Sequence, residues 1–163
     1  MTELLSNLDI VYYCKLLKIP INDVLSKDLF NDIKPKEGNY VINLDDSQNQ
    51  GTHWTCIILK DNYAVYYDSF GLSMPNDILK FIYRYSKKIN LVYSNDQIQH
   101  YNSVYCGWFV IYFLYFFNVN KCKNYKHLIN KHNSIFKLED RKLNDKIIRQ
   151  LFFYVFNKYK IKI

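Results

Sequence analysis

The chain has 163 residues, of which 49% are hydrophobic and 18% aromatic, with only 4 Gly and 3 Pro. This length and composition suit one folded domain spanning residues 1–163, and they exclude disordered and fibrous chains. The net charge of +7 is uneven, because residues 1–120 contain 10 Lys and Arg against 12 Asp and Glu, whereas residues 121–163 contain 12 against 3.

The N-terminal region is predicted to be helical. Apolar residues near helical spacing predict a helix over residues 4–17, which Pro20 ends. The members of this apolar pattern are Leu4, Leu5, Leu8, Val11, Tyr12 and Leu16. Residues 22–30 are expected to form a short second helix, and residues 35–38 have the composition of a turn.

Strands are predicted in the middle of the chain, where β-branched and aromatic residues gather between turn signals. The predicted strands cover residues 40–44, 53–59, 63–68 and 91–93. A tight turn at residues 61–62 joins the second strand to the third. His53 and Asp68 are therefore expected to lie side by side on neighbouring strands of one sheet.

Three more helices are predicted. Pro75 stands near the first position of a helix that runs to Lys87. The apolar run that follows Cys106 predicts a buried central helix over residues 106–117, and the last helix covers residues 144–158. The elements together predict an α+β fold, in which a small antiparallel or mixed sheet packs against helices.

Secretion and membrane association are not expected. The longest apolar run, residues 104–117, is shorter than the ~20 residues that cross a bilayer. Glu3 stands early and no uninterrupted apolar run follows, so no signal peptide is predicted. The spacing of the cysteines indicates reduced thiols rather than a disulfide framework or a zinc ribbon. The four cysteines are Cys14, Cys56, Cys106 and Cys122.

Four polar residues occur in an order that suits a cysteine hydrolase. His53 lies in Gly-Thr-His-Trp, Asp68 in Tyr-Asp-Ser-Phe-Gly, and Gln99 and Cys106 in Gln-His-Tyr-Asn-Ser-Val-Tyr-Cys-Gly. These side chains could act as base, orienting acid, oxyanion donor and nucleophile. Each residue taken singly also suits a structural role, and their joint presence in this order favours the catalytic interpretation.

The predicted position of Cys106 favours its reactivity. A thiolate at a helix N-terminus is stabilised by the helix dipole, and His53 could form the ion pair with it. The backbone N–H of Cys106 could join the Gln99 amide in stabilising an oxyanion. Trp54 is expected to form one side of the site, and Gly107, which has no side chain, would let a substrate approach closely.

Several weaker patterns have plainer alternatives. His100 adjoins Gln99, and His53 is favoured over it as the base. The pattern Cys-x4-His-x4-His at residues 122–132 matches no common zinc motif, so no metal site is predicted and a basic surface loop and helix is expected there. Asp45 and Asp46 suit a solvated loop. Cys14 and Cys56 are expected in the core.

The basic C-terminal quarter suits a polyanion such as nucleic acid, although a solvated helical face is an equal alternative. The candidate nucleic-acid contacts are Lys121, Lys123, Lys126 and Lys131.

The blocks Gly-x-His-Trp, Asp-x-Phe-Gly and Gln-x-x-Asn-Ser-x-x-Cys-Gly resemble those of the adenovirus maturation proteases, the adenain family. More broadly they resemble the cysteine peptidases that include SUMO and other ubiquitin-like-protein proteases. The blocks cover residues 51–107, about a third of the chain, and the last is the most specific. Asn, Lys, Ile and Tyr are abundant, as is typical of proteins from AT-rich coding sequences. With the size of the chain, this composition makes a virophage or Polinton-type maturation protease the nearest resemblance.

The resemblance implies Cys106 as nucleophile, His53 as general base, Asp68 as the residue that orients His53, and Gln99 as an oxyanion-hole donor. Family members favour small residues, often Gly-x-Gly or Gly-Gly, just before the cut. A narrow groove near Trp54 and Gly107 would account for that preference.

The chain also departs from the family pattern. Adenain has Glu at the third position of its catalytic triad. This chain has Asp68 there, and the SUMO proteases also have Asp. Adenain is activated by a capsid-derived peptide through a disulfide to a cysteine upstream of the nucleophile. No cysteine lies between Cys56 and Cys106 here, which leaves non-covalent activation open. Adenain also uses DNA as a cofactor, and the basic C-terminal quarter is compatible with this.

The sequence therefore predicts a viral cysteine endopeptidase that cleaves capsid or other virion precursor proteins during particle maturation. Its chemistry needs no cofactor, and DNA or a viral peptide are candidate activators. We expect a monomer in the virion and the host cytoplasm, with viral structural proteins as substrates. The alternatives are a deubiquitinase or ubiquitin-like-protein protease of the same chemistry, and a non-catalytic nucleic-acid-binding protein.

Overall fold

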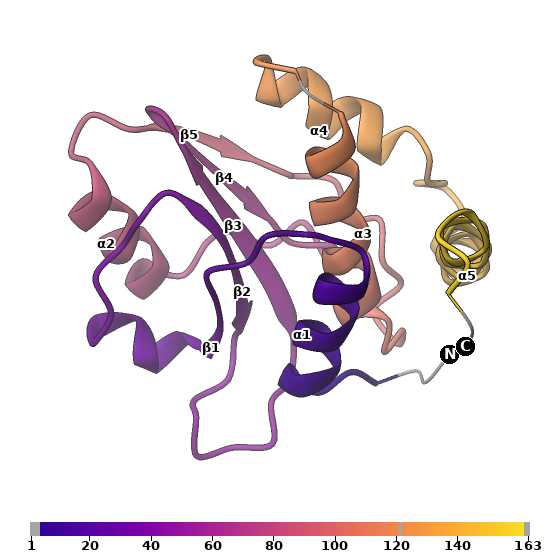
Figure 1. The fold of residues 1–163 in the computed structure, drawn as a ribbon, viewed down its shortest axis with the longest axis horizontal. Coiled ribbons are helices and arrows are strands. Elements are labelled where there is room, and N and C mark those ends of the chain that lie inside the picture. Colours follow the sequence, from indigo (N-terminus) through magenta and orange to yellow (C-terminus); the bar gives the residue numbers. More distant parts are fainter. Residues whose placement is uncertain (1–3, 121, 162–163) are drawn as a thin grey trace.

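The computed structural model describes residues 4–120 and 122–161, and its centre is a five-stranded mixed sheet with helices on both faces (Figure 1). The outer pairs β1–β2 and β4–β5 are parallel, and the inner pairs are antiparallel. The predicted α+β fold is confirmed. The strands, in the same order along the chain and across the sheet, are β1 (Asp23–Ser26), β2 (Gly38–Asn43), β3 (Trp54–Lys60), β4 (Tyr63–Tyr67) and β5 (Asn90–Tyr93).

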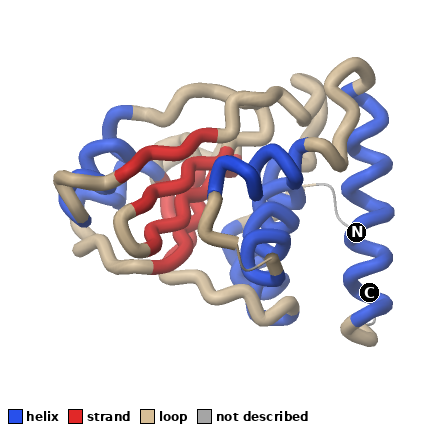
Figure 2. Tube along the Cα trace, turned by 90° about the horizontal axis from the view of Figure 1, so that it is seen from above, coloured by secondary structure: helices blue, strands red, loops and turns tan. Residues whose placement is uncertain are grey.

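The helices form two layers of unequal size. One face of the sheet is covered by α2 and the 3-10 helix η1, and the other by α3 with α1, α4 and α5 around it. Figure 2 shows α5 on the outer side of this larger layer. The bounds are α1 (Asn7–Leu16), η1 (Lys27–Asn31), α2 (Asn76–Tyr85), α3 (Cys106–Val119), α4 (Tyr125–Asn133) and α5 (Arg141–Lys158).

The central helix α3 is buried along most of its length, as its apolar sequence predicts. Every residue from Cys106 to Phe116 is buried. Trp108 contacts Tyr13 of α1 and Phe152 of α5, with ring centroids 4.7 and 4.8 Å apart. Burying each such large side chain stabilises the fold by roughly 1.5–3 kcal/mol, so α3 is held rigidly between the sheet and the outer helices. No described helix is long and apolar enough to cross a bilayer.

The predicted hairpin is formed by β3 and β4. Cys56 pairs with Tyr67 at one end of the hairpin, and Asp61 turns the chain with φ +53° at the other. His53 directly precedes β3 and Asp68 directly follows β4. Both residues therefore come to the same end of the sheet.

The prediction of a helix over residues 22–30 is wrong. The segment forms β1 and then η1, and β1 pairs in parallel with β2, with Asp23 opposite Tyr40. Backbone hydrogen bonds to the neighbouring strand outweigh the local preference of so short a segment.

The helix predicted over residues 4–17 is present as α1, but most of the apolar residues whose spacing predicted it are exposed. Leu4 and Leu8 are 70% and 75% exposed, whereas Ile10 and Cys14 are fully buried. The helix begins at Asn7 rather than at residue 4, because Ser6 and Asp9 form a reciprocal capping box. Apolar residues occur all round this helix, so spacing alone did not identify the face that packs on α3. Cys14 and Cys56 are in the core, as predicted.

His132, the second of the two histidines in α4, is enclosed by aromatic rings. His132 is fully buried. Its Nδ1 donates to Oδ1 of Asn133 at 2.9 Å, and the nearest ring, that of Phe113, lies 5.0 Å away between centroids. Burial lowers the pKa of His132 from 6.5 to about 4, and the hydrogen bond to Asn133 opposes this only in part. His132 is therefore neutral in the folded protein at neutral pH.

Acidification is expected to destabilise the fold through His132. Its pKa is lower in the folded state than in the unfolded state, so its stabilising contribution is complete above about pH 6.5 and is lost as the pH falls through about 4. The free energy of unfolding should fall by up to ~1.4 kcal/mol per pH unit in this window. Urea unfolding between pH 4 and 7 measures this, and His132→Phe should flatten the slope. An equal slope in both proteins would contradict it.

Candidate active site

His53 and Asp68 form a buried pair at the end of the β3–β4 hairpin. Nε2 of His53 lies 2.8 Å from Oδ1 of Asp68, and the backbone N–H of Phe70 donates to the same oxygen at 2.7 Å. Asp68 is fully buried and His53 is 7% exposed. The ring of Phe70 packs on the imidazole at 4.5 Å between centroids. The carboxylate therefore fixes the orientation of the histidine ring.

The pair changes the protonation of His53. Burial on its own lowers the pKa of His53, but the hydrogen bond to Asp68, the neighbouring Cys106 thiol and the charges of these two groups outweigh burial and raise the pKa to about 9. Because its folded-state pKa exceeds the usual 6.5, His53 stabilises the fold fully below about pH 6.5, and this contribution is lost as the pH rises through about 9.

The second ring nitrogen of His53 has no hydrogen-bond partner among the described residues. This atom, Nδ1, is buried. Since Nε2 is engaged by Asp68, Nδ1 is the nitrogen left for proton exchange with the Cys106 thiol.

Cys106 is the first residue of α3 and is 7% exposed. The N-cap residue is Tyr105, whose ring cannot cap a helix N-terminus as a Ser or Asp side chain would. The first backbone hydrogen bond of the helix runs from the N–H of Phe109 to the carbonyl of Tyr105, so the N–H groups of Cys106 and Gly107 precede the helical ladder. A helix N-terminus of this kind favours a negatively charged oxygen next to Cys106.

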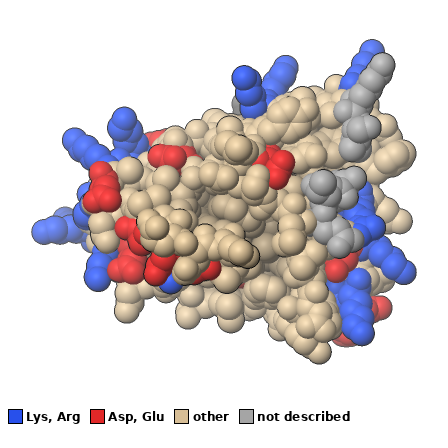
Figure 3. Space-filling view, turned by 90° about the horizontal axis from the view of Figure 1, so that it is seen from below, with Lys and Arg blue, Asp and Glu red and all other residues tan. Residues whose placement is uncertain are grey.

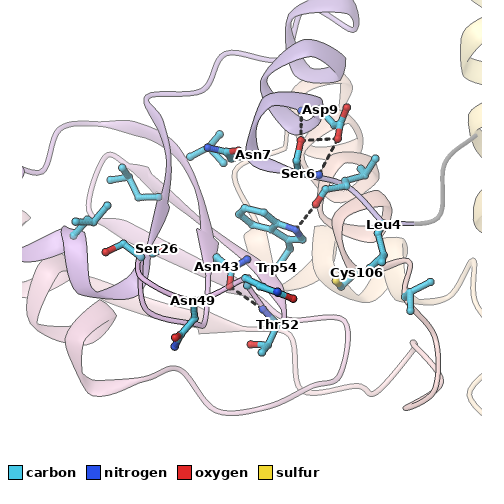
Figure 4. A pocket seen from close by; sticks show the side chains of 18 residues that line it. Leu4, Ser6, Asn7, Asp9, Ser26, Asn43, Asn49, Thr52, Trp54 and Cys106 are labelled. Carbon is cyan, nitrogen blue, oxygen red and sulfur yellow. Dashed lines mark hydrogen bonds between the residues drawn. The ribbon is translucent and has the colours of Figure 1, made fainter.

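Cys106 opens onto a groove of about 800 Å³ (Figure 4). Four segments line it: the start of α1 with the residues before it, β1 with η1, the loop between β2 and β3 with the strand residues next to it, and the segment that enters α3. Asp9 is the one charged residue among those that line the groove, and it is hydrogen-bonded to Ser6. Seen from below, the middle of this face is hollowed, with Asp and Glu side chains above it and to its lower left, and with Lys and Arg side chains projecting from the edges (Figure 3). The groove thus suits an uncharged, extended segment of a polypeptide.

Trp54 forms part of the groove wall together with the N-terminal segment. Its Nε1 donates a hydrogen bond to the carbonyl of Leu5 at 2.9 Å. The side chain of Leu5 in turn lies against Gly107, where an added Cβ would be 3.1 Å from the Leu5 Cβ. Gly107 therefore faces Leu5 closely, and its predicted contact with substrate stays a prediction.

Replacing Gly107 with alanine is expected to impair activity more than stability. The methyl group would displace Leu5, and with it the wall at Trp54, while the better helix propensity of alanine offsets up to ~1 kcal/mol of the strain. We expect kcat/KM to fall about tenfold, which corresponds to ~1.4 kcal/mol, with a thermal midpoint close to that of the parent. Combining Gly107→Ala with Leu5→Ala should restore part of the loss, and an unchanged kcat/KM in the single variant would contradict the expectation.

The loop before His53 is fixed by Asn43, which the sequence analysis missed. Oδ1 of Asn43 accepts from the N–H groups of Asp45 at 2.9 Å and Thr52 at 3.2 Å. Gly51 packs against the same side chain with φ +85°, a conformation that glycine adopts without strain. An Asn at the end of a strand before a polar loop is a recognisable turn signal, so this contact could have been predicted.

Gln99 is fully buried and contacts Ser69, the residue after Asp68. Its Oε1 accepts from the Ser69 hydroxyl at 2.5 Å, and its Nε2 donates to the carbonyl of Ser103 at 2.8 Å. The amide thus joins the residue after Asp68 to the loop that leads into Cys106. Its role as an oxyanion donor stays a prediction. His100 is held within the same loop, where its Nδ1 accepts from the N–H of Asn102 at 3.2 Å.

The predicted nucleic-acid contacts lie away from the catalytic pair. Lys123, Lys126 and Lys131 are exposed on or just before α4, and Lys121 lies outside the described residues. Figure 1 shows α4 beside the C-terminal end of α3, whereas Cys106 is at the N-terminal end. Within residues 4–120 and 122–161, no group of three or more His, Cys, Asp or Glu side chains is placed to hold a metal ion.

The fold is similar to that of known proteases. The crystal structure of the ASFV pS273R protease aligns with a TM-score of 0.51 and 12% identity over 84% of this chain and 68% of that chain. The C-terminal Ulp1 protease domain, in complex with Smt3, the yeast ortholog of SUMO, aligns with a TM-score of 0.46 and 14% identity over 79% of this chain and 73% of that chain. No family model matches the sequence, and no curated protein matches it. At such low identity, the likeness to the ASFV protease shows a shared fold.

Proposed function

We propose that this protein is a cysteine endopeptidase with Cys106 as nucleophile, His53 as general acid and base, and Asp68 as the residue that orients His53. The observation that carries the proposal is the buried His53–Asp68 pair at 2.8 Å, with its free imidazole nitrogen left for a thiol at the N-terminus of the central helix. The fold shared with the ASFV pS273R protease supports the same reaction class.

The proposed reaction is acyl transfer in two steps. The Cys106 thiolate adds to the carbonyl carbon of a peptide bond, and the oxygen that becomes negative lies near the first N–H groups of α3. Protonated His53 then gives its proton to the leaving amine as the C–N bond breaks, which leaves a thioester on Cys106. In the second step His53 takes a proton from water, and the hydroxide adds to the thioester, releases the acid and restores the thiolate.

The shape of the groove supports a substrate class. The wall formed by Trp54 and Leu5 lies next to Cys106, and the groove is lined almost entirely by uncharged residues. We propose viral capsid or other virion precursor proteins as substrates, cut after small residues such as Gly-x-Gly, which carry little side-chain bulk past this wall.

Incubation of the protein and a Cys106→Ala variant with the structural proteins encoded beside it, with mapping of new termini by mass spectrometry, tests the proposal. Cleavage after small residues by the unmodified protein alone is the expected result. Equal cleavage by Cys106→Ala would refute it. If Cys106 reacts with a ubiquitin or SUMO probe that ends in a diglycine electrophile, and structural proteins are not cleaved, the substrate is a ubiquitin-like protein rather than a virion protein.

DNA is proposed as a partner of the basic C-terminal quarter. Replacing Lys123, Lys126 and Lys131 with glutamine should weaken binding to duplex DNA and reduce the slope of log K against log salt by ~0.9 for each phosphate that the protein no longer neutralises. Fluorescence anisotropy at several salt concentrations measures both quantities. Replacing Lys80, Lys87 and Lys88 in the same way removes the same charge elsewhere on the surface and serves as the control. Equal weakening in the two triple variants would exclude α4 as the specific DNA-binding element.

A further inference from the structure

The first turn of α5 holds the loop that carries Gln99. Nε of Arg141 donates to the carbonyl of Gln97 at 2.9 Å, and Nδ2 of Asn144 donates to the carbonyl of Ile98 at 2.7 Å. Oδ1 of Asp145 accepts from the Ser103 hydroxyl at 2.7 Å. Residues at these spacings lie on one face of a helix. Hydrogen bonds from one face of α5 therefore hold both ends of the segment 97–103, and Gln99 lies between these two ends.

The orientation of the Gln99 amide is determined by the chemistry of its partners. A backbone carbonyl can only accept a hydrogen bond, so the amide atom 2.8 Å from the Ser103 oxygen must be the nitrogen. The carbonyl oxygen of the amide then faces the Ser69 hydroxyl, which donates to it at 2.5 Å. The two N–H groups of Gln99 are thereby directed towards Ser103, one to its carbonyl and one to its hydroxyl, and the longer of these bonds, at 3.2 Å, is the one that an oxyanion would replace.

The bonds around Gln99 all run in one direction. Ser69 donates to Gln99, and the Gln99 amide nitrogen reaches the Ser103 hydroxyl at 3.2 Å, which in turn donates to the Asp145 carboxylate. A carboxylate only accepts, so it determines the direction of the Ser103 hydroxyl and leaves the oxygen of that hydroxyl to accept from Gln99. Hydrogen bonds aligned in this way strengthen one another.

We propose that Asp145, with Arg141 and Asn144 in the same turn, is a positioning residue for the Gln99 amide, so that α5 determines whether the oxyanion site beside Cys106 is formed. This inference rests on the proposed peptidase function for its effect on catalysis. Without the Asp145 charge the Ser103 hydroxyl could reverse and turn its hydrogen towards the Gln99 nitrogen, which would displace the second N–H of Gln99 from the position in which it can reach an oxyanion.

A peptide aldehyde separates this role from that of the nucleophile. The Cys106 thiolate adds to the aldehyde carbon and the oxygen of the adduct needs the oxyanion donors, whereas alkylation by iodoacetamide needs only the thiolate. The probe is N-acetyl-Leu-Gly-glycinal, and its affinity is read from the protection of Cys106 against iodoacetamide. Mass spectrometry of the Cys106 peptide separates it from the exposed Cys122.

Asp145→Asn should leave the alkylation rate within about twofold of the parent and weaken the aldehyde about tenfold, against roughly 10²-fold for Gln99→Ala. The double variant should bind the aldehyde no more weakly than Gln99→Ala alone, because both changes remove one function. Glu139→Gln, an exposed acidic residue just before α5, is the charge-matched control and should match the parent. Additive losses, or an unchanged aldehyde affinity in Asp145→Asn, would overturn the proposal.

Hydrogen exchange of backbone amides tests, independently of catalysis, whether α5 holds the segment 97–103 in place. The N–H of Gln99 donates to the Ser69 carbonyl at 2.9 Å and that of Ser103 to the His100 carbonyl at 2.8 Å. Both should exchange faster in Asp145→Asn than in Glu139→Gln, while amides of β3 are unchanged. Equal exchange in the two variants would refute the positioning role. Failure of the aldehyde to protect the parent protein, with the exchange difference present, would instead count against the proposed peptidase.

Discussion

Replacing Asp68 with asparagine is expected to slow peptide hydrolysis by about 10²–10⁴-fold, the range in which general acid–base catalysis contributes. Asparagine keeps the size of the side chain but removes the charge that raises the pKa of His53 against the effect of burial. It could also donate to Nε2 and so favour the wrong tautomer of the imidazole. The thiol would then face a ring that holds its proton less firmly.

The pH profile distinguishes this effect from a general loss of structure. The parent should lose activity above about pH 9, as His53 loses the proton that it gives to the leaving amine, and in Asp68→Asn this alkaline limit should move towards pH 6.5. Asp77→Asn, which changes an exposed acid on α2, is the matched control. An alkaline limit that stays in place in Asp68→Asn would show that Asp68 does not govern His53.

Replacing Trp108 with alanine is expected to lower the free energy of unfolding by about 3–5 kcal/mol, as for other large aromatic side chains in protein cores. Trp108 is fully buried and lies between Tyr13 of α1, Phe152 of α5 and the body of α3. Its removal would leave a cavity directly behind the first turn of the catalytic helix. We therefore expect activity to fall with stability.

Denaturant unfolding, followed by circular dichroism, measures the loss in Trp108→Ala. Phe153→Ala is the control, because Phe153 is adjacent to Phe152 on α5 but is 66% exposed, and its change should stay within ~0.5 kcal/mol. A loss in Trp108→Ala no larger than that of the control would mean that α1 and α5 are not packed through this residue.

The central helix and the proximity of His53 to Asp68 could be predicted from the sequence because each has a strong local signal. The apolar run that starts at Cys106 is too continuous for an exposed helix, and the tight turn at Asp61 identifies the hairpin that places His53 beside Asp68. In both cases the information lies within about 15 neighbouring residues.

The features that could not be predicted depend on contacts between distant parts of the chain. β1 is a strand because β2 lies beside it, and α1 buries Ile10 rather than Leu8 because of where α3 lies. The bond between Ser103 and Asp145 joins residues 42 positions apart, and neither residue has a sequence pattern that indicates the other. Pattern analysis also gave no sign that Leu5 would close the groove at Trp54.

The grip of α5 on the loop before Cys106 has a consequence for the order of events during synthesis. Residues 97–103 can be held in place only after Arg141, Asn144 and Asp145 have left the ribosome, and contacts of such long range form late in folding. Cys106, the proposed nucleophile, is thus translated well before the helix that completes its surroundings. A growing chain would carry Cys106 without an assembled site, and proteolytic activity would begin only once the C-terminal helix has docked.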